Sequence, residues 1–333
     1  MNYLRKFFMI HIRSEIIGHG HYVPSKVLTN DDLSKMVDTN DEWISTRTGI
    51  KQRNVSEGEL TSDLAFNAAQ MALKNANVSA EDVDLVVLAT DTPDNTTPAT
   101  AAKISARLGV KAGTPSFDIS AACSGFVYAL TMADNMIRLG QIKTAVVIGA
   151  ETLSNITDWT DRNTCVLFGD GAGAVVIRAR ESNGDISESG IFATKIYSDG
   201  TKFDSLKTNG GVSSTKSAGF VEMDGKEVFK YAIGSLCQGA ETVMEMCGVK
   251  AEDIDWLLPH QANIRIISGV GQKLSVPEEK VVVNLQNHGN TSAASIPLAL
   301  SEYMESGKIK KGDLVVLTAM GAGFTWGGAL VRI

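Results

Sequence analysis

Short apolar runs alternate with longer amphipathic stretches along most of the chain. Apolar runs near residues 85–88, 144–149 and 314–317 predict buried strands, and the apolar residues between them recur at helical spacing. One stretch places its apolar residues on a single helical face: Phe229, Ile233, Leu236, Ala240, Val243, Met244 and Cys247. Buried strands that alternate with helices are typical of a largely parallel sheet. The pattern therefore predicts an α/β fold.

The same order of elements occurs twice. In each copy a helical stretch precedes an acidic segment, residues 80–84 or 251–255, which is followed by a strand and a second helical stretch. This agreement in order predicts a duplicated chain, with residues 14–180 as an N-terminal half and residues 181–333 as a C-terminal half. Two unrelated α/β stretches would share part of this pattern and are the alternative.

The bulk composition limits the classes of function. The 333 residues are 44% hydrophobic and 21% charged, as in a soluble globular protein, and the formal charge is −7. This charge argues against nucleic acid as a main partner, because phosphate binding requires a basic surface. No apolar run approaches the ~20 residues of a membrane span. Residues 1–13 are short and basic, and we interpret them as a flexible leader, with a transit segment as the alternative.

The four cysteines show no paired spacing. Cys123, Cys165, Cys237 and Cys247 form no CxxC motif, which argues against a disulfide framework or a zinc site. A reducing compartment, the cytoplasm, is therefore expected. Cys165 falls in an apolar segment, residues 165–168, that we interpret as a strand, and the last two cysteines are interpreted as helical packing residues.

Cys123 lies where a strand meets a helix. The strand predicted at residues 116–119 leads through small residues to the thiol, and residues 126–139 predict a helix that Gly140 ends. The N-terminal dipole of this helix favours a thiolate, and the small neighbours leave room for a substrate. A lone cysteine is often a core residue. At this position the sequence is equally consistent with a core residue and with a nucleophile.

Two further polar residues follow strands. His260 follows the strand predicted at residues 256–259 and opens the next helix, and Asn290 follows the strand predicted at 281–283. Ser292 is a plausible cap for the helix after it. Open α/β sheets place their sites at the carboxyl ends of strands. His260 alone could be structural, but Cys123, His260 and Asn290 in equivalent places predict a catalytic site.

Two glycine-rich segments have different meanings. Residues 169–173 superficially resemble a dinucleotide fingerprint, but they precede a strand and not the required helix, so we reject that interpretation. Residues 321–328 follow the last long strand. They could bring a backbone N–H into an oxyanion hole or could form a tight turn between two strands.

Six motifs carry a resemblance to a known family. They are residues 41–50, 121–126, 168–174, 259–263, 288–295 and 323–327. In this order they resemble β-ketoacyl-(acyl carrier protein) synthase III from Ile16 to Ile333. The resemblance implies a duplicated thiolase fold, built as a five-layer α-β-α-β-α sandwich, and a homodimer.

The resemblance also implies a reaction that begins fatty acid synthesis. Cys123 would take an acyl group from acyl-CoA, and malonyl-(acyl carrier protein) would lose CO₂ and attack the acyl-enzyme. The backbone N–H groups of Cys123 and Ala322 would hold the oxyanion. His260 and Asn290 would donate hydrogen bonds to the malonyl thioester carbonyl. No metal or redox cofactor is required.

The resemblance extends to the binding of both substrates. Trp43 and Arg162 would sandwich the adenine of CoA, Arg47 would meet its phosphates, and Asn263 would help orient the site. An acidic carrier protein requires a basic patch. The resemblance assigns it to three residues: Lys230, Arg265 and Lys273.

Two departures leave the substrate open. Thr97-Pro98 stands where some relatives carry a phenylalanine in the acyl pocket, and Ala322 stands where a glycine is expected. A condensing enzyme of secondary metabolism with the same three residues is the main alternative. A Cys-His-Asn hydrolase and a non-catalytic scaffold of the same fold are the others.

Overall fold

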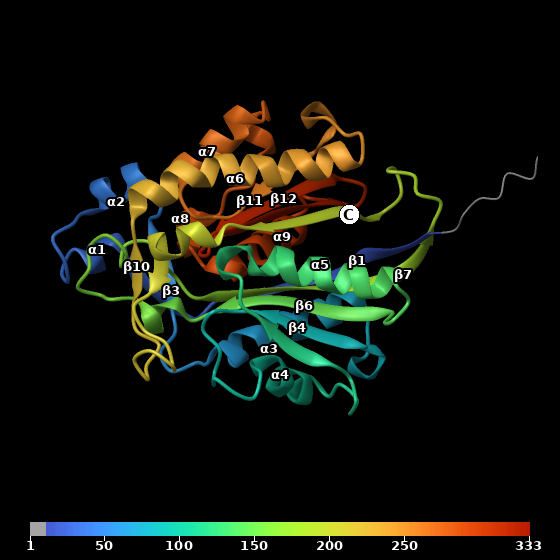
Figure 1. Ribbon diagram of the computed structural model, residues 1–333, viewed down its shortest axis with the longest axis horizontal. Helices are drawn as coiled ribbons and strands as arrows, with labels where there is room; N and C mark the ends of the chain where they lie inside the picture. Colours follow the sequence, from blue (N-terminus) through green and yellow to red (C-terminus); the bar gives the residue numbers. More distant parts are fainter. Residues whose placement is uncertain (1–10) are drawn as a thin grey trace, which may run out of the picture.

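The first of two central sheets is built from the N-terminal half. The computed structural model describes residues 11–333 (Figure 1). The sheet has the order β1-β7-β6-β4-β5, in which β4 runs parallel to β5 and β6, and β7 runs antiparallel to β6 and β1. Its strands are β1 (His11–Tyr22), β4 (Leu85–Ala89), β5 (Ser116–Ile119), β6 (Thr144–Glu151) and β7 (Gly171–Ser182).

The second sheet repeats this arrangement. Its order is β11-β12-β13-β8, with β11 parallel to β12, and β13 antiparallel to both β12 and β8. A single parallel bridge from Val281 to Leu257 occupies the place of β5. Matching sheets confirm the predicted duplication of the fold. The strands are β8 (Gly190–Ser198), β11 (Trp256–Pro259), β12 (Leu314–Gly321) and β13 (Thr325–Arg332).

The helices form three layers around the two sheets (Figure 1). One outer layer packs on the first sheet, and the other packs on the second. The middle layer contacts both sheets and is apolar on most sides, as in the buried Phe126, Leu130 and Ile137. The predicted five-layer sandwich is confirmed. The outer helices are α3 (Thr61–Ala76), α4 (Thr100–Leu108), α6 (Gly225–Met246) and α7 (Ile264–Lys273), and the middle ones are α5 (Gly125–Arg138) and α9 (Ser295–Glu305).

Shorter elements connect these layers. Two small antiparallel pairs, β2 with β3 and β9 with β10, stand outside the main sheets. The bounds are β2 (Lys26–Thr29), β3 (Gln52–Val55), β9 (Leu206–Thr208), β10 (Val221–Met223), α1 (Asn30–Leu33), α2 (Asp41–Thr48) and α8 (Leu285–His288).

The N-terminal strand begins earlier than expected. We predicted a flexible leader over residues 1–13; residues 1–10 lie outside the described part of the chain, but His11 to Arg13 belong to β1. They pair with Arg180 to Ser182, the last residues of β7. The division of the chain at residue 180 stays a prediction. The first sheet ends at Ser182 and the second begins at Gly190.

Two predicted strands are wrong. Residues 165–167 form a turn, and Phe168 makes only an isolated bridge to Asn290. In the turn the Cys165 N–H donates to the Asp161 carbonyl (3.0 Å), and the buried Arg53 guanidinium donates to the Val166 carbonyl (2.7 Å). Residues 281–283 contribute only the bridge at Val281. Apolar runs of this length fit a buried loop as well as a strand. Within residues 11–333 we find no helix long and apolar enough to span a bilayer.

Candidate active site

Cys123 lies in a 3₁₀ turn between β5 and α5, as the predicted elbow requires. The turn spans Ala122–Ser124, and Ala122 adopts a left-handed conformation (φ 47°). Such a conformation is strained for a residue with a side chain, and a small one suits it best. The chain thereby turns sharply and leaves the Cys123 side chain half-buried at the end of the first sheet.

The second half builds the same turn beside it. Residues Ser292–Ala294 precede α9, and Ser292 has nearly the same φ (48°) as Ala122. Our prediction of Ser292 as a helix cap is wrong, because α9 begins at Ser295 after an uncapped Ala294. Ser292 instead forms a hydrogen bond with the Cys123 thiol. The Asn290 side chain holds this turn by accepting from the Ser292 N–H (2.8 Å).

His260 follows β11 and is 3% exposed. Its Nδ1 lies 2.7 Å from the Ser295 Oγ. Burial lowers the pKa of His260 to about 3, so the ring is neutral at physiological pH. With Ser295 donating to Nδ1, the ring carries its proton on Nε2 and can donate there. The helix predicted to open at His260 starts later, at Ile264.

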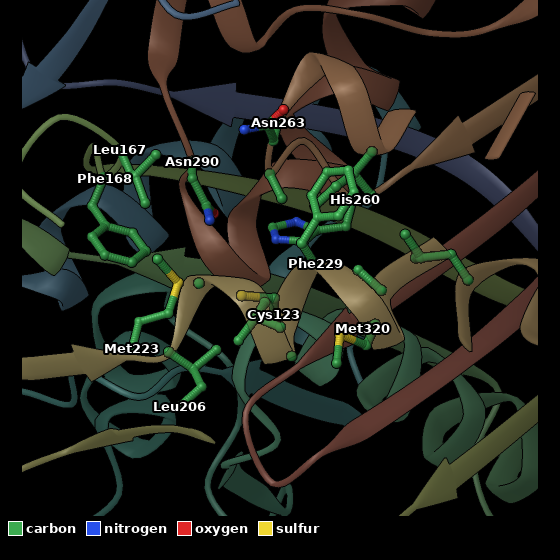
Figure 2. A pocket seen from close by; sticks show the side chains of 17 residues that line it. Cys123, Leu167, Phe168, Leu206, Met223, Phe229, His260, Asn263, Asn290 and Met320 are labelled. Atoms are coloured by element: carbon green, nitrogen blue, oxygen red, sulfur yellow. The ribbon is translucent and has the colours of Figure 1, made fainter. Parts of the chain in front are cut away.

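The three candidate catalytic residues line one cavity of about 740 Å³. Figure 2 shows the side chains of Cys123, His260 and Asn290 pointing toward one another from three separate segments. The rest of the lining is mostly apolar and includes Phe168, Leu206, Met223, Val228, Phe229, Leu236 and Met320. An apolar cavity with a thiol and two neutral hydrogen-bonding groups suits an acyl substrate better than a charged one.

The electrostatics at Cys123 differ from our expectation. Burial raises the pKa of the thiol to about 12, and the nearby Asp91 and Glu151 add to this shift while the Ser292 hydrogen bond opposes it. We expected the dipole of α5, which begins at Gly125, to favour the thiolate, but burial of the thiol has the larger effect. The resting thiol is therefore protonated, and loss of its proton must accompany the chemistry.

Ala322 lies in the turn that joins β12 to β13, so the tight-turn interpretation of this segment is correct. Ala322 also lines a second cavity beside Cys123, which is where an oxyanion donor would be needed. The preceding Gly321 packs on the elbow, since a methyl group there would lie 2.5 Å from the Cys123 backbone nitrogen. The donor role of Ala322 stays a prediction.

The predicted CoA-binding residues gather around α2. The guanidinium carbons of Arg47 and Arg162 lie 4.8 and 4.4 Å from the centre of a Trp43 ring. Asn263 joins this group to the cavity, because its Nδ2 donates to the Arg47 carbonyl (3.0 Å) and it lines the cavity. Arg162 rests directly on the indole, so an adenine could enter between them only if Arg162 moved.

The predicted carrier-protein patch lies on neighbouring helices. Lys230 is on α6, and Arg265 and Lys273 are on α7, all three exposed. Lys230 lies 3.4 Å from Glu227, an ion pair whose mutual attraction water weakens. Arg265 covers the Phe229 ring at 5.2 Å, and Phe229 lines the cavity. Arg265 therefore lies beside the cavity, and the role of the patch stays a prediction.

Sequence reasoning missed four polar groups at this site. Ser292 and Ser295 contact the thiol and the imidazole, and the carboxyl groups of Asp91 and Glu151 raise the thiol pKa. The signal was available for Asp91 and Glu151, which stand at the carboxyl ends of β4 and β6. In residues 11–333 we find no group of three or more His, Cys, Asp or Glu side chains placed to hold a metal ion.

A duplicated five-layer fold with a cysteine at the first elbow defines the thiolase-like condensing enzymes. Residues 117–200 match the family described as 3-oxoacyl-[acyl-carrier-protein (ACP)] synthase III, and residues 244–333 match its C-terminal part. The β-ketoacyl-[acyl-carrier-protein] synthase III of Paramagnetospirillum magneticum is 56% identical to this chain. The similarity covers 97% of this chain and 99% of the length of that relative.

Solved structures agree with this assignment. The crystal structure of 3-oxoacyl-[acyl-carrier-protein] synthase III from Aquifex aeolicus has a TM-score of 0.90 and 50% identity, over 96% of this chain and all (100%) of that one. The priming β-ketosynthase of the R1128 polyketide pathway has a TM-score of 0.90 at 34% identity, over 97% of each chain. The chain belongs to the β-ketoacyl-[acyl-carrier-protein] synthase III family.

Proposed function

We propose that this protein joins an acyl-CoA primer to malonyl-(acyl carrier protein) and thereby initiates fatty acid synthesis. The observation that carries the proposal is the meeting of Cys123, His260 and Asn290 in one largely apolar cavity. Family membership supports the same reaction.

In the first proposed step, the Cys123 sulfur attacks the thioester carbonyl of acyl-CoA. The new C–S bond forms as the bond to the CoA sulfur breaks. Cys123 loses one proton and the departing CoA thiolate takes up one proton, so no net proton is released. The oxyanion would be held by the N–H groups of Cys123 and Ala322. Burial raises the pKa of this thiol to about 12, so the free enzyme holds the proton. The thiol would therefore lose its proton only after acyl-CoA has bound.

In the second step, malonyl-(acyl carrier protein) would enter the cavity with His260 and Asn290. The bond to its carboxylate breaks, CO₂ leaves, and the electron pair forms an enolate that attacks the acyl carbon. The Cys123 sulfur is expelled as a thiolate, which takes up a proton from water to restore the thiol. A neutral His260 and an amide donate to the enolate oxygen without binding the ground-state carboxylate strongly. The product is a 3-oxoacyl-(acyl carrier protein), and no metal or redox cofactor takes part.

The same proposal assigns the binding surfaces. Trp43, Arg47 and Arg162 would hold CoA, with Asn263 as the link to the cavity. Lys230, Arg265 and Lys273 would meet the acidic carrier protein. We place the enzyme in the cytoplasm, which suits four free cysteines, one of them the nucleophile.

We also propose a homodimer. The outer edge of the first sheet is β5, which pairs only with β4 among the described residues. Its four residues are all partly exposed, and an open strand edge invites pairing with a second copy.

A priming condensing enzyme of secondary metabolism is the second candidate. The similarity to a polyketide priming synthase favours it, as does Thr97 in place of an aromatic residue. Both candidates share the acylation of Cys123, and they differ in the donor that works best.

The test is intact-mass analysis after incubation with a panel of acyl-CoAs, followed by addition of malonyl-(acyl carrier protein). Cys123→Ala should show no adduct. His260→Ala and Asn290→Ala should form the acyl-enzyme but release CO₂ at least about a hundredfold more slowly than wild type. Acylation blocked as fully by either of these two changes as by loss of the thiol would contradict the division of roles.

A further inference from the structure

The second cavity beside Cys123 contains a carboxyl group that the proposed reaction does not use. This cavity of about 740 Å³ shares Cys123, Phe168 and Leu206 with the first. Its wall is mainly apolar, with Leu153, Ile156 and Val221 among the lining, but Asp91 also lines it. An acyl chain attached to Cys123 and lying in this cavity would therefore pass a carboxyl group.

Asp91 retains the capacity to bind another donor. Its Oδ1 accepts a hydrogen bond from the Ser120 hydroxyl (2.9 Å), and the Ala122 N–H also faces the carboxylate. Both Asp91 and its partner Ser120 are exposed, so the carboxylate is accessible. A carboxylate has about four acceptor sites, so two remain for a ligand.

The carboxyl group of Glu151 accepts hydrogen bonds from the backbone of Asp91. The Asp91 N–H donates to both oxygens of Glu151 (3.2 Å each), and Glu151 also accepts from the Thr92 hydroxyl (2.6 Å). Glu151 is fully buried, and burial together with the charge of Asp91 raises its pKa to about 8. Lys207, the other charged residue of the lining, pairs with Asp204 at 2.7 Å. Glu151 therefore holds the Asp91 backbone in place, and Lys207 does not pair with the Asp91 carboxylate.

The cavity continues past Asp91 into polar surroundings. Asp91, Ile156 and Thr208 also line a neighbouring groove of about 1440 Å³. The remaining groove residues are mostly polar: Thr92, Asp94, Asn95, Thr96, Thr152, Asn155, Lys216 and Ser217 among them. An apolar chain that covered Asp91 would strip it of water without replacing the lost hydrogen bonds, which is unfavourable.

We propose that Asp91 selects short acyl primers that carry a hydroxyl group over apolar primers of the same shape. The hydroxyl would donate to the Asp91 carboxylate while the thioester carbonyl lies at Cys123. A site built to pair with a hydroxyl rejects the analogue that lacks it, because the polar group of the site is left unpaired. The inference rests on the proposed function, since it requires a primer on Cys123.

The test compares two donors that differ by one group. The chain of 3-hydroxybutyryl-CoA carries a hydroxyl where 3-methylbutyryl-CoA carries a methyl group. The rate of Cys123 acylation by each, followed by intact mass, gives a ratio that is insensitive to the amount of folded enzyme. We expect wild type to favour the hydroxylated donor by about tenfold or more, and Asp91→Leu to favour the methylated one.

Two further variants sharpen the test. Asp91→Asn is nearly identical in shape and should retain only part of the preference for the hydroxylated donor. If Asp91→Leu does not fold, the donor ratio of Asp91→Asn tests the role of Asp91 by itself. Asp94→Asn is the matched control, because Asp94 stands in the same loop but pairs with Lys103 (2.7 Å) and does not line the cavity of Cys123. Its donor ratio should equal that of wild type.

The outcomes separate this inference from the proposed function. A wild-type enzyme that favours the methylated donor, or a ratio that neither Asp91 variant changes, would overturn the role of Asp91 while acylation itself upheld the proposed function. Failure of every donor, acetyl-CoA included, to acylate Cys123 would contradict the proposed function and this inference with it.

Discussion

At the scale of single residues, burial removes charge from the groups proposed to react. It raises the pKa of the Cys123 thiol to about 12 and lowers the pKa of His260 to about 3, so both are neutral near pH 7. A neutral imidazole that accepts from Ser295 at Nδ1 can donate from Nε2. The neutral imidazole can donate a hydrogen bond to an enolate. The Cys123 thiol, however, is not present as a thiolate near pH 7.

The high pKa of Cys123 predicts how its reactivity depends on pH. Only the thiolate is nucleophilic, and below its pKa the thiolate fraction rises tenfold per pH unit. Alkylation of Cys123 by iodoacetamide, followed by mass against a Cys123→Ala control, should therefore accelerate steadily from pH 7 to 10. A rate that levels off below pH 9 would mean that the helix dipole outweighs burial, as the sequence first suggested.

Cys123 and His260 were predictable because each follows a strand of a recognisable α/β pattern, whereas the strand predicted before Asn290 does not form. Asp91 and Glu151 follow strands in the same way and could have been found by applying that rule to the strand at residues 85–88 and to the one at 144–149. The hydrogen bond between Ser295 and His260 joins residues 35 positions apart and depends on the packing of α9. The pKa values were not predictable either, because burial follows from the assembled fold.

At the scale of elements, two matching turns build the site. The turns Ala122–Ser124 and Ser292–Ala294 each precede a middle-layer helix and each begin with a left-handed residue. The first contributes the thiol, and the second contributes Ser292 as its hydrogen-bond partner. The repeat in the sequence predicted equivalent halves, and the structure shows that these halves place their turns in contact.

Close approach of the second turn depends on a glycine in β6. A methyl group at Gly149 would lie 2.2 Å from the Ala293 carbonyl oxygen. Gly149→Ala should therefore lower stability by about 1–3 kcal/mol and disturb the turn beside Cys123. Gly234→Ala in α6 is the control of opposite sign. No neighbouring atom lies within 4 Å of its new methyl group, and the change should stabilise the helix by about 1 kcal/mol.

Thermal unfolding measures both effects. We expect the Tm of Gly149→Ala to fall and that of Gly234→Ala to rise. If Gly149→Ala unfolded at the wild-type temperature and kept wild-type acylation, then the two turns would not be packed as tightly as described.

At the scale of the whole molecule, both this protein and its proposed carrier-protein partner are acidic. The net charge is −7, so only a local patch can attract a carrier protein. Lys230, Arg265 and Lys273 stand on α6 and α7, the outer layer next to the cavity, and Arg265 covers Phe229 at its border. Asn263, beside the predicted CoA-binding residues, and Phe229, beside the patch, line the same cavity, so both proposed substrates would approach Cys123 through it.

The edge strand β5 predicts how two copies would meet. The carbonyls of Pro115 and Ile119 accept hydrogen bonds from β4, so by alternation the N–H of Ser116 points to the outer edge. Ser116→Pro removes that donor and should shift the protein from dimer toward monomer in light scattering at micromolar concentration. Ser116→Thr keeps the donor and should remain dimeric. A wild-type monomer, or a proline variant as dimeric as wild type, would exclude pairing through β5.

Because β5 leads directly into the elbow of Cys123, a monomeric variant should also lose part of its acylation rate.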